Sequence, residues 1–70
     1  MTLTDERKAQ LIKEVMQRTR HEYDMALLQW KNTPRGRRSE QPVFDEMDCF
    51  LKLAFMNDAS LVKLHNIVAA

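Results

Sequence analysis

Three carboxylates lie close together at Asp45, Glu46 and Asp48, and such a cluster is where a metal site or a general acid–base pair is first sought. On a helix, however, residues 45 and 46 point about 100° apart, so the two carboxylates do not converge. Their place at the start of an apolar run suits the first turns of a helix, where the helix dipole favours negative charge. We therefore predict no catalytic residue and no metal ligand in this cluster.

The single cysteine and the two histidines give no nucleophile or metal-binding pattern either. Cys49 has no second cysteine for a disulfide or a CxxC pair, and we interpret it as a small buried hydrophobe. His21 and His65 are far apart and match no ligand spacing. Because no glycine-rich phosphate loop is present either, the sequence predicts a non-enzymatic protein with no cofactor and no small-molecule substrate.

The strongest polar feature is a group of arginines near the middle of the chain, which could bind nucleic-acid phosphates. Residues 31–48 hold four basic and four acidic residues, so this region carries no net charge. Nucleic-acid affinity depends on neutralising several phosphates, and a region without net charge is poorly suited to that task. A dimeric nucleic-acid-binding regulator is therefore our alternative hypothesis, with candidate contacts at Arg35, Arg37, Arg38, Arg18 and Arg20.

The helix breakers determine the elements that position these residues. Pro34, Gly36 and Pro42 are the only proline and glycine residues in the chain, and they lie within nine residues of one another. The segments on either side are uninterrupted and carry apolar residues at helical spacing. We predict one all-α domain over residues 1–70, an antiparallel hairpin with a first helix over about 5–32, a polar loop over 33–41 and a second helix over about 42–68.

The predicted second helix has apolar residues on two faces, and a helix of this kind is expected to be buried on both. The broader stripe contains Val43, Phe44, Met47, Phe50, Leu51, Ala54 and Phe55. The first helix can cover that stripe, so another polypeptide must cover the opposite one. We predict a protein interface at Cys49, Leu53, Met56 and Ile67, with Met25 and Leu28 on the first helix as a secondary surface.

Asn57 and Asp58 leave a second geometry open, because both residues are good helix caps. If the chain turns there, a short third helix folds back and covers the stripe at Cys49, Leu53 and Met56. Met25 and Leu28 then become the better candidate surface. We favour one continuous helix, because its length matches that of the first helix and no glycine or proline enforces a turn.

Length and charge indicate how such a chain works. Seventy residues bury too little surface for high stability, and association with a second chain would supply the rest. Residues 1–38 carry a net charge of +4 and residues 39–70 a net charge of −3, so the total is +1. A lone thiol and a start without a signal-peptide pattern predict a cytoplasmic protein, and no apolar run is long enough to span a membrane.

We conclude from the sequence that the chain is a helical interaction module, such as an adaptor, a co-chaperone or a small regulator. It would act by packing an apolar helix face against a protein partner or a second copy in a homodimer. In length, hairpin shape and polar turn it is similar to small helical hairpins such as plasmid-copy RNA-binding hairpins and the co-chaperones of bacterial type III secretion. This similarity concerns architecture alone and transfers no functional residue.

Overall fold

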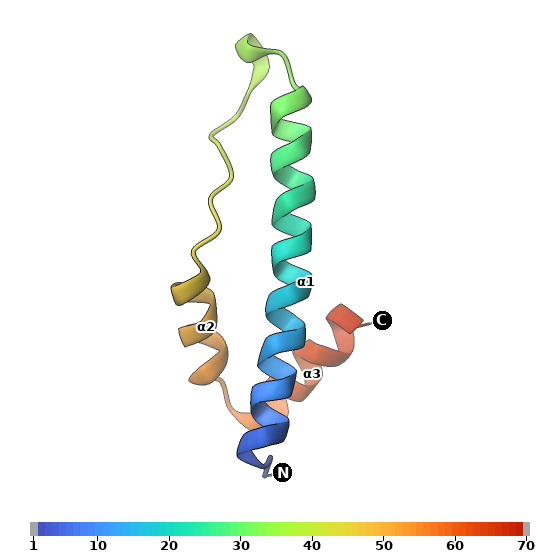
Figure 1. Cartoon of the computed structure of the whole chain (residues 1–70), viewed down its shortest axis with the longest axis vertical. Coiled ribbons are helices and arrows are strands. Elements are labelled where there is room, and N and C mark those ends of the chain that lie inside the picture. Colours follow the sequence, from blue (N-terminus) through green and yellow to red (C-terminus); the bar gives the residue numbers. More distant parts are fainter. Residues whose placement is uncertain (1, 70) are drawn as a thin grey trace.

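The computed structural model describes residues 2–69, which form an elongated all-α fold of about 50 × 24 × 16 Å (Figure 1). Helix α1 (Asp5–Asn32) runs the length of the molecule. A short 3-10 turn, η1 (Arg35–Arg37), reverses the chain, which then returns beside α1. Helices α2 (Glu46–Ala54) and α3 (Asp58–Ala69) both pack against the N-terminal half of α1. The predicted all-α class and antiparallel hairpin are confirmed.

Local hydrogen bonds explain where α1 begins and ends. The Thr4 hydroxyl accepts a hydrogen bond from the Arg7 N–H at 3.1 Å, which satisfies one of the free donors at the helix start. Asp5 and Glu6 occupy the first turn, where their charge complements the dipole. At the other end Thr33 is extended, as expected for the residue before a proline. The observed bounds coincide with the range expected from the sequence.

The second helix begins four residues later than expected. Asp45 forms its N-cap, with a carboxylate oxygen that accepts a hydrogen bond from the Asp48 N–H at 2.9 Å. The preceding residues are non-helical, and the Phe44 ring packs against Tyr23 of α1 with 5.7 Å between ring centroids. This contact and the Asp45 cap explain why Pro42 does not open the helix. The prediction of a start at residue 42 is therefore wrong.

The preferred prediction of one continuous second helix is also wrong, because the chain turns between α2 and α3. The Asn57 side chain accepts a hydrogen bond from the Ser60 N–H at 2.8 Å and caps α3. Asp58 accepts another at 2.8 Å from the Leu3 N–H, which ties the start of α3 to the N-terminal segment. The alternative three-helix geometry is the one observed, and side-chain caps produce the turn without glycine or proline.

The core is small and lies where the three helices meet. Its buried side chains are Leu11, Ile12 and Val15 of α1, Leu53 of α2 and Leu61 of α3. Partly buried apolar side chains surround them: Leu3, Met16, Cys49, Ala54, Met56, Val62, Leu64 and Val68. No polar or charged side chain within residues 2–69 is buried, so packing and not an internal polar network holds the helices together.

Leu61→Ala should lower the free energy of unfolding by about 2–5 kcal/mol, because Leu61 is 0% exposed at the centre of this core. Ile67→Ala in the same helix is the control, since Ile67 is 65% exposed and its truncation should cost less than about 1 kcal/mol. Urea denaturation followed by circular dichroism measures both values. Equal losses from the two substitutions would contradict the observed docking of α3.

A candidate protein-binding surface on helix α2

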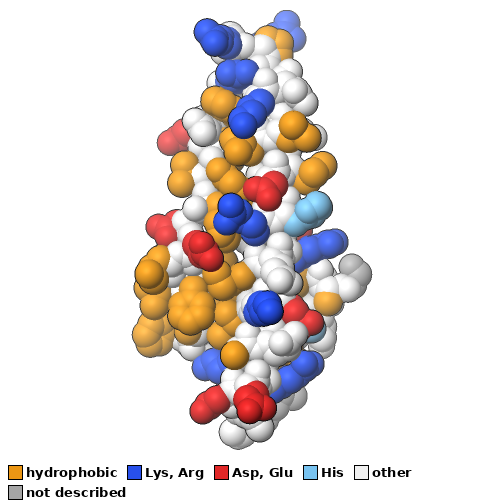
Figure 2. All heavy atoms as spheres, viewed as in Figure 1, with side chains coloured by type: hydrophobic (Ala, Val, Ile, Leu, Met, Phe, Trp, Pro, Cys, Tyr) orange, Lys and Arg blue, Asp and Glu red, His pale blue; other side chains and the backbone are white. Residues whose placement is uncertain are grey.

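The largest group of exposed apolar side chains lies on α2 and the residue pair that precedes its cap. Phe55 is 87% exposed and Met47 is 68% exposed. Figure 2 shows hydrophobic side chains gathered at the lower left of this face of the molecule, over α2. We define the α2 apolar surface as Val43, Met47, Phe50, Leu51 and Phe55. These residues belong to the broad stripe that the sequence analysis assigned to the core against the first helix.

The face of α2 that was predicted to bind a partner is packed in the core, and most of the face that was predicted to be core is exposed. Leu53 is only 4% exposed and belongs to the core with Leu61, and Cys49 and Met56 are partly buried against the same cluster. Because α3 folds back against α1, Leu61 joins Leu53 in the core, and the stripe that was predicted to bind a partner is buried or half-buried within the chain. The interface prediction at Cys49, Leu53 and Met56 therefore loses its physical basis. Ile67 remains exposed, but it lies on α3 and not in one row with them.

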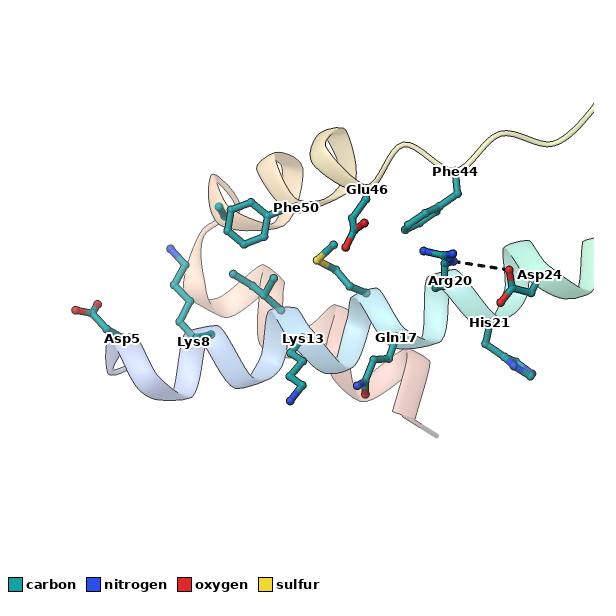
Figure 3. Close-up of a pocket in the computed structure, with 14 residues that line it drawn as sticks. Asp5, Lys8, Lys13, Gln17, Arg20, His21, Asp24, Phe44, Glu46 and Phe50 are labelled. Carbon is teal, nitrogen blue, oxygen red and sulfur yellow. Dashed lines mark ion pairs between the residues drawn. The ribbon is translucent and has the colours of Figure 1, made fainter.

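A groove of about 710 Å³ lies between α1 and the segment that contains α2. Its apolar lining comes from both sides: Ile12 and Met16 of α1, Phe44 of the connector, and Phe50 and Ala54 of α2. In Figure 3 the rings of Phe44 and Phe50 lie above α1, and Glu46 points down between them. Phe50 belongs to both features, so the groove continues directly into the α2 apolar surface.

Charged residues of opposite character border the groove on its two sides. The α1 side carries Lys8, Lys13 and Arg20 together with Asp5 and Asp24, which is a net positive edge. The α2 side contributes one charged residue to the lining, the carboxylate of Glu46. The groove is therefore apolar along its floor, with a net positive charge on its α1 edge and the carboxylate of Glu46 on its α2 edge.

Arg20 at the groove edge, and Lys52 on the side of α2 away from the groove, are both held by contacts within the chain. The Arg20 guanidinium lies 3.7 Å from the Asp24 carboxylate and 5.6 Å from the centre of the Phe44 ring. Lys52 lies 3.0 Å from the Asp48 carboxylate, and this hydrogen bond raises the pKa of the lysine above its ordinary value. Both ion pairs are exposed and contribute little to stability.

The secondary surface that the sequence analysis named is smaller. Met25 and Leu28 are each about half exposed on α1. They lie one helical turn apart and neither lines the groove. Two exposed side chains of this kind are ordinary on a protein surface. The structure therefore favours the α2 apolar surface over this pair, and Met25 serves below as a matched control.

The arginines proposed for nucleic-acid contact do different things in the structure. Arg38 packs its guanidinium 4.5 Å from the centre of the Trp30 ring and donates hydrogen bonds to the carbonyls of Thr33 at 2.9 Å and Lys31 at 2.7 Å. The Trp30 indole N–H donates to the Ser39 carbonyl at 2.7 Å. Arg38 therefore caps the C-terminal end of α1 and holds the connector against it.

The other four arginines do not form one patch. Arg35 and Arg37 are exposed in η1 at one end of the molecule. Along the axis of α1, Arg20 lies about 18 Å from the C-terminal end of the helix, at 1.5 Å per residue. It is paired with Asp24. Arg18 borders a separate hollow beside His65. The structure brings Arg35 and Arg37 together and leaves Arg18 and Arg20 apart from them.

His65 and Cys49, the remaining candidates for chemistry, have structural roles. The imidazole Nε2 of His65 lies 2.8 Å from a carboxylate oxygen of Glu14, which links α3 to α1. Partial burial raises the pKa of the Cys49 thiol, and the neighbouring Asp48 raises it further, so the thiolate is scarce at neutral pH. Within residues 2–69 no group of histidine, cysteine and carboxylate side chains is arranged to hold a metal ion.

None of the helices formed by the described residues has both the length and the apolar character needed to cross a membrane. Comparison of the chain with protein-family models, with curated proteins and with solved structures gives no match.

Arg38→Ala should lower the free energy of unfolding by about 1–3 kcal/mol, because it removes two charge-assisted hydrogen bonds and the contact with Trp30. The fluorescence of Trp30, the only tryptophan, should shift to longer wavelength as the indole becomes more hydrated. Arg37→Ala is the control and should leave both quantities nearly unchanged. If Arg38→Ala changes neither the free energy of unfolding nor the Trp30 fluorescence, the capping role of Arg38 is refuted.

Alkylation of Cys49 by iodoacetamide at neutral pH should be slower in the folded protein than in urea, because burial and Asp48 raise the pKa of the thiol. Asp48→Asn removes the negative neighbour, lowers that pKa and should speed the reaction in the folded state. Asp24→Asn, on another helix, should have no effect. Identical rates for Asp48→Asn and the unmodified protein would show that Asp48 does not influence the thiol.

Proposed function

We propose that this chain is a non-enzymatic protein–protein interaction module that binds a polypeptide through the α2 apolar surface and the adjoining groove. The observation that carries the proposal is the exposure of Val43, Met47 and Phe55 beside a groove lined by Phe44 and Phe50. The chain would act as an adaptor, a co-chaperone or a small regulator. A cytoplasmic setting fits a chain with a single unpaired thiol.

The size of the surface supports this proposal. A whole aromatic side chain offers roughly 150–250 Å², so the five residues of the α2 apolar surface expose on the order of 500–600 Å² at their exposed fractions. Soluble monomers seldom leave a continuous apolar patch of more than a few hundred Å² uncovered, and such patches are often binding sites. Burial of this area by a partner would be favourable by roughly 25 cal/mol per Å² before the costs of association.

The small core gives a second line of support. Five buried side chains within residues 2–69 are few, and domains of this size are marginal without an added source of stability. No disulfide can form within a chain that has one cysteine. A partner that binds only the folded chain would raise its stability by mass action. Binding at the α2 apolar surface would therefore complete the fold as well as perform the function.

The alternative function, nucleic-acid binding by a dimeric regulator, has weaker support. Arg38 is engaged by Trp30 and two backbone carbonyls, and Arg20 is paired with Asp24. Arg35 and Arg37 remain as an exposed pair, which would neutralise about two phosphates and give a shallow salt dependence. Binding to generic RNA or DNA that weakens steeply with salt, and that is lost with Arg35→Ala and Arg37→Ala, would revive this alternative.

Site-specific photo-crosslinking in cells of the native source tests the proposed function. A photoreactive amino acid at position 47 should give covalent adducts with a polypeptide, because Met47 lies on the α2 apolar surface. The same amino acid at position 25 is a matched control, since Met25 is also a helical methionine, is 53% exposed and lies outside the groove. Mass spectrometry of the adducts identifies the class of molecule bound.

Polypeptide adducts at position 47 with few or none at position 25 support the proposed function. Equal yields at the two positions would indicate nonspecific collision. Adducts with nucleic acid, or no adducts at position 47, would overturn the proposal.

A further inference from the structure

We infer that the polypeptide covering the α2 apolar surface is a second copy of this chain, placed by a two-fold axis so that α2 of each copy lies in the groove of the other. This inference rests on the proposed function and names the partner. Three properties of the described residues favour a second copy over a foreign helix: the charge pattern at the edges of the groove, the dimensions of α2 and the groove, and the available area.

The charge pattern is self-complementary. A helix that enters the groove meets Lys8 and Lys13 on the α1 edge, whose net charge is positive, so negative charge on the entering helix would complement that edge. The entering helix must also present an apolar face to Phe50 and Ile12. Helix α2 has both properties, because Glu46 and Asp48 flank the exposed side chains of Met47 and Leu51. The chain therefore carries both the groove and a helix that fits its chemistry.

The position of each charge suits a two-fold arrangement. At 100° per residue, Asp48 lies about 20° from Phe55 around α2, at the border of the exposed face farther from the groove. Lys13 extends from α1 away from α2, at the opposite edge of the groove (Figure 3). In this arrangement α2 of one copy lies over the groove of the other, and the exposed faces of the two α2 helices touch. We expect Asp48 of each copy to approach Lys13 of the other. A two-fold interface forms this pair twice.

The dimensions are also compatible. Helix α2 is about 14 Å long at 1.5 Å per residue. The part of α1 that lines the groove, Asp5 to Asp24, extends over about 28 Å and is long enough to accommodate it. The resulting layout places two α1 and two α2 helices around one apolar centre, which is an ordinary helical-bundle arrangement.

The area and the net charge complete the argument. The α2 apolar surface together with the groove walls approaches the roughly 800 Å² per partner that stable interfaces bury. The net charge is only +1 per chain, so two copies repel each other little. A foreign partner would have to reproduce the acidic and apolar pattern that α2 already has.

Sedimentation equilibrium of the purified full-length chain tests the inference. The wild type should sediment as a dimer, and its melting temperature should rise over roughly a hundredfold increase in protein concentration. Met47→Glu should shift the equilibrium at least about tenfold toward monomer, since it buries a charge in the interface. Met25→Glu should leave it unchanged. If Met47→Glu fails to fold, the concentration dependence of the wild-type melting temperature decides alone.

A charge exchange tests the two-fold arrangement. Lys13→Glu and Asp48→Lys should each weaken self-association by on the order of tenfold, because each places like charges at two symmetric contacts. Mixed in equal amounts, the two variants should form heterodimers of about wild-type affinity, since both contacts then join opposite charges. Variants that dimerise as well as the wild type would overturn the arrangement.

The failure of this inference can be told apart from the failure of the proposed function. A wild type that stays monomeric at all concentrations, with a melting temperature independent of concentration, would overturn the second-copy inference. If position 47 still crosslinks to a different polypeptide in cells, the proposed function stands with a foreign partner. If it crosslinks to no polypeptide, both fail.

Discussion

The burial of Leu61 in the core that α1, α2 and α3 share is the interaction on which the rest of the structure depends. It holds α3 against α1 in one buried cluster with Leu11, Ile12 and Val15, and Leu53 of α2 belongs to the same cluster. Leu53 faces this core, and Phe50 and Ala54 line the groove, so the remainder of the broad stripe of α2 is exposed. The position of the turn at Asn57 therefore decides which face of α2 is core and which is surface.

This constraint explains why so few side chains are buried. Helix α1 is about 42 Å long, whereas α2 and α3 are about 14 Å and 18 Å long at 1.5 Å per residue. Two short helices cover only the N-terminal half of α1, and the connector lies beside the other half (Figure 1). There Tyr23 packs on Phe44, and Trp30 is held by Arg38 and Ser39. Aromatic and cation–π contacts thus take the place of helix packing along the upper part.

The sequence was sufficient to predict the fold class, the position of the hairpin and the cap at Thr4, because helix breakers and capping residues act locally. It was insufficient to choose between the two geometries at Asn57, because a capping side chain can also continue a helix. That choice depends on how well Leu61 packs against α1, which is a tertiary property. The candidate site followed from the same choice: the two-faced pattern of α2 was recognised, but the exposed face was assigned wrongly.

Two features of the structure, the contact of Arg38 with Trp30 and the complementary charges, are already visible in the sequence. Arg38 follows Trp30 by eight residues across a tight turn. This spacing allows the Arg38 guanidinium to pack on the Trp30 ring. The opposite net charges of the two halves of the chain also indicated complementary surfaces. The sequence did not reveal whether that complementarity acts within one chain or between two, because the answer depends on which charges border the groove.

The central claim is that the α2 apolar surface is covered by a polypeptide, and methionine oxidation measures this most directly. Hydroxyl-radical footprinting compares Met47 and Met25, two exposed methionines in helices of the same chain. We predict that Met47 becomes protected from oxidation as the concentration of the protein rises, whereas Met25 oxidises at a constant rate. Equal and concentration-independent oxidation of the two residues, in the purified protein and in cells of the native source, would contradict the account.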